Sequence, residues 1–103
     1  MTTKLVELYQ YRTNNRRLFA KIEGENPSGS MKDRFVHYAI PMMETSGQLK
    51  PNMTIVEASS GNTGIALAKA SKMYNHNIVI CMSTHASQKK KEIITRFLPY
   101  MGI

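Results

Sequence analysis

The second half of the chain alternates short apolar runs with helical patterns, and this order most constrains the fold. Residues 54–57 and 77–82 are predicted to be strands, and residues 65–74 and 88–100 are predicted to be helices. Strand, helix, strand, helix is typical of parallel strands joined by right-handed crossovers. We therefore predict an α/β domain with an open, mainly parallel sheet.

The first half is predicted to hold a pair of strands followed by a helix. Residues 4–11 and 18–22 are apolar runs separated by a polar connection, which favours a hairpin or a crossing pair. After a stretch of turn formers, residues 33–46 carry apolar side chains at helical spacing. These apolar residues are Phe35, Tyr38, Ala39, Met42 and Met43, of which Met42 and Met43 are expected to fill the core. Pro41 should bend this helix and Gly47 should end it.

Length and charge limit the function classes. A chain of 103 residues allows one domain at most, and an apolar content of 42% excludes a disordered tail. Lys and Arg number 14 against 7 Asp and Glu, which gives a formal net charge of +7, partly in the run Lys89-Lys90-Lys91. No aromatic residues interleave these lysines, so a solvated helix face is favoured and we expect no nucleic-acid partner.

Other features point away from a metal site, a disulfide and a membrane. Cys81 is the single cysteine and lies in an apolar run, so we expect a buried, chemically idle thiol. The three histidines are far apart and lack metal-ligand spacing. Neither a membrane-spanning apolar run nor a signal-peptide core is present, and we expect a cytoplasmic protein.

Two polar turns precede predicted helices, where ligands gather in parallel sheets. One of them provides hydroxyl groups and a backbone open to close approach, and it consists of Ser59, Ser60, Gly61, Asn62 and Thr63. Such a turn suits an anion, although an ordinary capped loop between a strand and a helix has the same composition.

The second turn leads into Lys32, at the start of the predicted helix. A cation in the first helical turn opposes the helix dipole, whereas the neighbouring Asp33 is favourable there. Two explanations stay open for Lys32. Its ammonium group turns toward solvent, or its amine is a nucleophile that forms a Schiff base with a carbonyl compound.

Both turns lie in motifs that closely resemble the cysteine synthase family, which includes O-acetylserine sulfhydrylase and cystathionine β-synthase. The motifs are NPSGSMKDR at residues 26–34 and ASSGNTGIALA at residues 58–68, with Leu49-Lys50-Pro51 between them. The resemblance extends from about Leu5 to Gln88. These proteins are fold-type II pyridoxal-phosphate enzymes, so the resemblance implies a three-layer α/β sandwich like their N-terminal subdomain.

The resemblance also implies roles for individual residues. Lys32 matches the catalytic lysine that holds pyridoxal 5'-phosphate covalently and moves the α-proton of the substrate. Asn62 matches the residue that binds the ring hydroxyl of the cofactor. The loop that binds the α-carboxylate of the amino-acid substrate corresponds to Ser59, Ser60, Gly61, Asn62 and Thr63. The implied reaction is β-replacement on an O-activated serine, such as O-acetylserine and sulfide giving cysteine.

The resemblance covers only part of a family member. Relatives are considerably longer, and their second half carries the glycine-rich loop for the cofactor phosphate. We therefore expect residues 1–103 to form a single, incomplete α/β domain that is inactive by itself. The chain also departs from the family at residues 83–91, where the family usually has a Met-Ser pair and a Glu-Arg-Arg helix start; only Ser87 and the basic character match.

Function classes therefore stay open at the level of sequence. The leading one is a cysteine synthase-like enzyme that forms a homodimer when complete. The alternative is a non-catalytic truncated paralogue or interaction subunit that retains the fold, and a basic nucleic-acid binder is a third.

Overall fold

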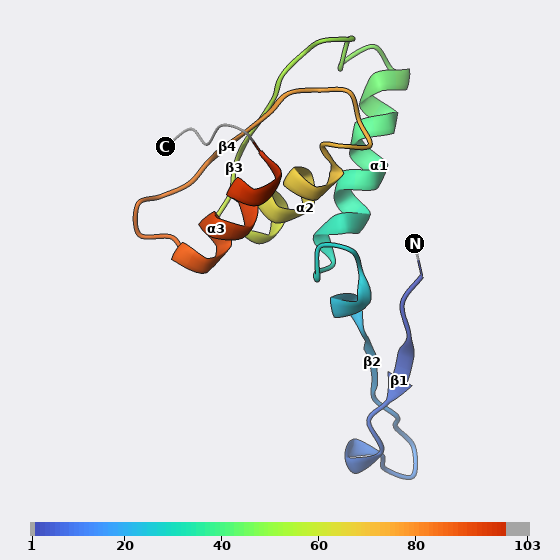
Figure 1. The fold of residues 1–103 in the computed structure, drawn as a ribbon. Coiled ribbons are helices and arrows are strands. Elements are labelled where there is room, and N and C mark those ends of the chain that lie inside the picture. Colours follow the sequence, from blue (N-terminus) through green and yellow to red (C-terminus); the bar gives the residue numbers. More distant parts are fainter. Residues whose placement is uncertain (1, 99–103) are drawn as a thin grey trace.

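The hairpin predicted for the first half is present and stands apart from the helices. The computed structural model describes residues 2–98. Strands β1 (Leu5–Glu7) and β2 (Phe19–Lys21) pair in antiparallel register, with Val6 opposite Ala20. Figure 1 shows this hairpin projecting away from the helical part of the molecule. Both strands are shorter than predicted, and the first is shortened because the short helix η1 (Tyr9–Tyr11) interrupts the first apolar run.

The remaining elements form an α/β unit in the order expected. They are η2 (Glu23–Glu25), α1 (Lys32–Thr45), β3 (Ile55–Ala58), α2 (Asn62–Ala70), β4 (Ile78–Cys81) and α3 (Gln88–Phe97). Strands β3 and β4 pair in parallel, with Ile55 opposite Ile78 and Ala58 opposite Cys81. The prediction of an α/β fold with parallel strands joined through helices is confirmed.

Helix α2 is the centre of the core. It packs against α1, α3 and β4, and its alanines Ala66 and Ala68 are fully buried. Small side chains let the neighbouring elements approach closely. The closest approach is at Gly64, where an added Cβ atom would lie 3.0 Å from Ile80 Cγ2 and 3.0 Å from Ile94 Cδ1. Both isoleucines are completely buried, so α2, α3 and β4 meet at this glycine.

Helix α1 buries only part of the set of apolar residues found at helical spacing: Met43 packs against the core, whereas Met42 is 48% exposed. Phe35 and Tyr38 are 56% and 69% exposed, whereas Val36 and Ile40 are buried in the core. The helix has two apolar stripes, and periodicity alone does not tell which of them faces α2. Helical structure continues through Pro41, and Figure 1 shows α1 as one continuous coil. The expected end at Gly47 is confirmed by its φ of 82°.

The other two helices end earlier than predicted. Helix α2 ends at Ala70 rather than Tyr74, and the Ser71 hydroxyl donates a hydrogen bond to the Ala68 carbonyl at 2.7 Å. Helix α3 ends at Phe97 because Leu98 is extended, as is usual for a residue that precedes proline. Its predicted last turn falls partly on residues 99 and 100, which lie outside the described residues.

Cys81 is exposed, and the prediction of a buried thiol was wrong. Side chains alternate across a strand, so Ile78 and Ile80 of β4 share one face and Cys81 lies on the other. The first face is covered by the helices, since Ile78 is 6% and Ile80 0% exposed. Val56 of β3 is on the same side as Cys81 and is 64% exposed. An apolar run does not reveal which of its residues points away from the core.

His76 makes structural contacts between elements. His76 Nδ1 lies 2.9 Å from the Met53 carbonyl oxygen, and its Nε2 lies 3.3 Å from Glu44 Oε2 at the end of α1. Within residues 2–98 no group of three or more His, Cys, Asp or Glu side chains could hold a metal ion. No helix in this described part is long and apolar enough to cross a bilayer.

Candidate active site

The structure brings the two predicted turns together around one pocket. Its volume is about 280 Å³, and it is lined by Lys32, Ala58, Ser59, Ser60, Asn62, Thr63 and Lys90. Lys32 comes from the start of α1, the serines from the turn that follows β3, and Asn62 and Thr63 from the first turn of α2. Every predicted site residue except Gly61 lines this pocket, and Gly61 lies within the same turn.

The loop that carries Lys32 is fixed by side chains of the NPSGS run. Asn26 is buried, and its Nδ2 donates to the Ser30 carbonyl at 3.0 Å and to Glu23 Oε2 at 2.9 Å. The buried carboxylate of Asp33 accepts hydrogen bonds from the backbone N–H and the hydroxyl of Ser28. Ser30 Oγ accepts the Lys32 backbone N–H at 3.2 Å. These contacts hold Lys32 in place as the first residue of α1.

Helix α2 is tied to the same loop. Lys69 Nζ, near the end of α2, donates a hydrogen bond to the Pro27 carbonyl at 2.7 Å. The helix that begins at the turn of residues 59–63 therefore also anchors the loop before Lys32. This contact positions the loop before Lys32 relative to α2.

The hydroxyl of Ser59 organises the other turn. Its Oγ accepts the backbone N–H groups of Gly61 and Gly64, each at 3.0 Å. The N–H groups of Asn62 and Thr63 have no hydrogen-bond acceptor within the described part of the chain. They lie at the positive end of the α2 dipole, so they are available to an anion. The turn therefore has the donors that the sequence predicted, with Ser59 also serving its internal structure.

Lys90 of α3 was not among the predicted site residues. The lysine run was interpreted as a solvated helix face, but only Lys89 of the three is exposed, whereas Lys90 and Lys91 are half-buried. The Lys90 side chain lies over Gly61, and its Nζ is 3.1 Å from the position that a Cβ atom of Gly61 would occupy. Ser87 marks the start of α3 in the sequence and accepts the Lys90 backbone N–H, but no sequence signal places the Lys90 side chain at the turn.

Two lysine side chains and no carboxylate line the pocket. Lys32 and Lys90 are both half-buried, and neither ammonium group has a carboxylate partner among the described residues. Together with the open N–H groups of α2, they make the pocket strongly electropositive. The arrangement can hold an anionic ligand beside a primary amine.

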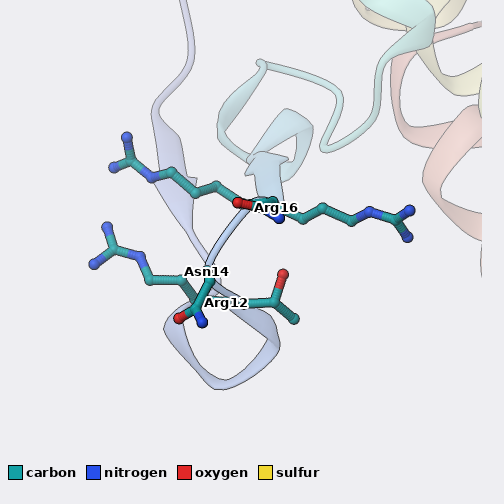
Figure 2. Close-up of a pocket in the computed structure, with 6 residues that line it drawn as sticks. Arg12, Asn14 and Arg16 are labelled. Atoms are coloured by element: carbon teal, nitrogen blue, oxygen red, sulfur yellow. The ribbon is translucent and has the colours of Figure 1, made fainter.

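A larger hollow in the hairpin lacks this chemistry. It measures about 500 Å³ and is lined by residues 12–17 of the connection between β1 and β2. Figure 2 shows the side chains that line it extending in different directions from the loop instead of converging. Arg12 Nη2 and Arg17 Nε donate to Glu7 Oε1 at 3.0 and 2.7 Å. Arg12, and then Arg17, hold the pKa of Glu7 below its ordinary value, so two of the arginines serve an internal ion pair.

The residues of the smaller pocket fit the aldehyde end of pyridoxal phosphate. A Schiff base needs an accessible primary amine, and the Lys32 amine lines the pocket without a bound carboxylate. Asn62 lines the same pocket and is exposed, and its amide group is of a kind that can bind a ring hydroxyl. By their chemistry, Lys32 would suit a covalent anchor and Asn62 one polar contact for such a cofactor.

Comparison with known proteins agrees with this geometry. The family model described as "Pyridoxal-phosphate dependent enzyme" matches residues 2–97. Cysteine synthase B of Pseudomonas syringae pv. syringae is 40% identical over 96 residues, which cover 92% of this chain and 57% of the relative. The O-acetylserine dependent cystathionine beta-synthase of Bacillus subtilis (strain 168) is 40% identical over 77 residues, covering 75% of this chain and 25% of the relative.

Solved structures show the same fold. The crystal structure of O-acetyl serine sulfhydrylase isoform 3 from Entamoeba histolytica superimposes with a TM-score of 0.86 and 34% identity, covering 98% of this chain and 32% of that one. The chain thus spans between about a quarter and about three fifths of the relatives described. The resemblance seen in the two motifs is confirmed, and the chain belongs to the family of pyridoxal-phosphate dependent enzymes.

Proposed function

We propose that the protein containing these residues catalyses pyridoxal-phosphate-dependent β-replacement on an O-activated serine, as cysteine synthases do. The observation that carries this proposal is the pocket that gathers Lys32 with the turn of residues 59–63. The names of the similar proteins, cysteine synthase B and O-acetylserine dependent cystathionine beta-synthase, support the same substrate class.

Each group in the pocket has a place in this reaction. When bound, the cofactor supplies an electron sink for breaking bonds at the α-carbon of the amino acid. Lys32 holds the cofactor and, when released from it, can take a proton from the α-carbon. The open N–H groups of Asn62 and Thr63 bind the substrate carboxylate and so orient the α-carbon toward Lys32.

A labelling experiment tests the role of Lys32. The 103-residue chain is incubated with pyridoxal phosphate, reduced with borohydride and digested, and the modified peptides are measured by mass spectrometry. We expect the peptide containing Lys32 to be labelled well above the peptide containing Lys89, an exposed lysine outside the pocket. Lys32→Ala should remove this label and Lys89→Ala should leave it. Equal labelling of both lysines would contradict the assignment.

The reaction itself is tested in the longer polypeptide that contains these residues. Cysteine formation from O-acetylserine and sulfide should require the cofactor and be abolished by Lys32→Ala. The 103 residues assayed alone should be far slower, because misplacing reacting groups by about 1 Å can cost a factor of about 100. A short chain as fast as the long one would show that the described pocket suffices. A long chain that binds the cofactor without forming cysteine would instead favour a non-catalytic paralogue.

A further inference from the structure

Lys90 occupies a position that its own helix does not favour. Helix α3 has Lys89, Lys90 and Lys91 in its first turn and no acidic residue there. Cations at a helix N-terminus oppose the dipole, and neighbouring lysines repel one another. Lys91 lessens this cost locally, because its Nζ donates to the Thr84 carbonyl at 3.0 Å. Lys90 has no such partner among the described residues, so its charge needs another explanation.

The aliphatic part of the Lys90 side chain lies against the turn of residues 59–63. Its Cδ and Cε atoms occupy the space beside Gly61 that a side chain at that position would fill. Gly61 is buried and has a φ of 156°, a backbone conformation that residues other than glycine rarely adopt. The absence of a Cβ atom at Gly61 therefore opens the space through which Lys90 reaches the turn.

The ammonium group of Lys90 ends at the same turn as the unoccupied donors. Nζ lies 3.1 Å from the ideal Cβ position of Gly61, and Lys90 lines the same pocket as Asn62 and Thr63. Because Ser59 Oγ takes the Gly61 and Gly64 N–H groups, the turn offers fewer backbone donors than its length suggests. The Lys90 ammonium group compensates for the missing backbone donors with a full positive charge.

We propose that Lys90 is a positioning residue that binds the carboxylate of the amino acid held at the turn of residues 59–63. This inference rests on the proposed function, because it assigns the pocket to an amino-acid substrate. It adds a charged contact from α3 to the hydrogen bonds from α2. The pocket then selects ligands that carry a free carboxylate and discriminates against the corresponding amides.

Binding of L-serine and of L-serinamide, which lacks the carboxylate, tests this inference. Backbone amide shifts of Asn62 and Thr63 are followed by NMR during titration of the isotope-labelled chain with each compound. L-Serine should give a saturable shift, and L-serinamide a much weaker one. Lys90→Met retains an apolar stem against Gly61 but removes the charge, so it should weaken serine binding about tenfold, corresponding to about 1.4 kcal/mol. Lys90→Arg should restore most of the affinity.

A matched control separates the local charge from the net charge of the helix. Lys89→Met removes the same charge from the neighbouring, exposed position and should leave serine binding within about twofold, because exposed charges are screened. Far-ultraviolet circular dichroism and the dispersion of the amide spectrum verify that each variant is folded.

The outcomes distinguish this inference from the proposed function. Serine affinity unchanged in Lys90→Met would overturn the role of Lys90 and leave the amino-acid site intact. An equal loss in Lys89→Met would also overturn it, because a general charge effect would then explain the result. Absence of a saturable shift in the unchanged chain would contradict both the inference and the assignment of the pocket to an amino acid.

Discussion

The polar residues of the pocket differ in what they contribute to binding and to folding. Ser59 Oγ accepts two backbone N–H groups and therefore supports the turn itself. Asn62 is exposed and Thr63 half-buried, and the structure gives neither side chain a hydrogen-bond partner within residues 2–98. Replacing Ser59 should disturb the fold, whereas replacing Asn62 or Thr63 should act mainly on ligands.

We expect Asn62→Ala and Thr63→Ala to weaken amino-acid binding much more than they weaken the fold. A hydrogen bond to a charged group is worth about 1.5–3 kcal/mol, which corresponds to roughly a 10- to 150-fold loss of affinity. The measurement is the amino-acid titration of the cofactor absorbance in the longer protein, beside thermal melts. Asn14→Ala, in the distant hairpin loop, is the control. Unchanged amino-acid titrations in both variants would exclude the turn as the carboxylate site.

The carboxylate of Glu23 links the chain start to α1 and should make stability depend on pH. Arg34 Nε donates to its Oε2 at 2.7 Å and Thr3 Oγ1 to its Oε1 at 2.7 Å. The hydrogen bond from Arg34, then that from Thr3, lowers the pKa of Glu23 from 4.5 to about 2. A depressed pKa means that the folded state binds this proton less readily than the unfolded state. The contact therefore stabilises the fold above pH 4.5, and this contribution is lost as the pH falls toward 2.

Glu23→Gln should remove that part of the pH dependence. The variant should have a lower free energy of unfolding than the unchanged chain near neutral pH, and the two should converge as the pH approaches 2. Urea unfolding at a series of pH values measures the difference. Glu92→Gln, on the exposed surface of α3, serves as the comparison. A constant gap between Glu23→Gln and the unchanged chain across the acid range would show that Glu23 stabilises by packing rather than by charge.

At the scale of elements, the contact of α2 with its neighbours depends on a missing side chain. Gly64→Ala places a Cβ atom 3.0 Å from each of two fully buried isoleucines, which must shift to admit it. Overpacking costs about 1–3 kcal/mol, and the gain in helix propensity offsets up to about 1 kcal/mol. The melting temperature should fall by about 4–8 °C per kcal/mol of net loss. In the control Gly24→Ala, the added Cβ atom has no neighbouring atom within 4 Å, so the melting temperature should change little. A Gly64→Ala variant that melts at or above the unchanged chain would refute this packing.

The elements were more predictable from sequence than their orientations. Strand and helix order follows from local periodicity, and the parallel pairing follows from the crossover helices. The inward face of α1 does not, because Phe35 and Val36 are both apolar and only tertiary contact selects Val36. Cys81 was misplaced for the same reason. The two turns of the site could be found because glycines and hydroxyl residues mark them, whereas Lys90 is recognised only once α3 is packed beside Gly61.

At the scale of the whole molecule, the described chain is extended and exposes much apolar surface. Its radius of gyration is 16.8 Å, against about 13 Å for a compact domain of this length. The hairpin projecting in Figure 1 accounts for part of this difference. On α1, the outward stripe of Phe35, Tyr38 and Met42 is 56%, 69% and 48% exposed. A helix with apolar side chains on both faces is normally buried on both faces.

We therefore expect the 103-residue chain to associate with itself in solution through the outward stripe of α1. Sedimentation velocity should show an average mass that rises above 11.7 kDa as the protein concentration increases. The double variant Phe35→Gln, Tyr38→Gln should stay closer to the monomer mass, because it removes the two largest side chains of the stripe while Val36 and Ile40 still pack against α2. The matched variant Tyr9→Gln, Tyr11→Gln changes equally exposed side chains on the hairpin, where the residues are 68% and 60% exposed. If only this second variant suppresses association, the chains associate through the hairpin and not through α1. If the unchanged chain remains monomeric at all concentrations, neither surface mediates self-association.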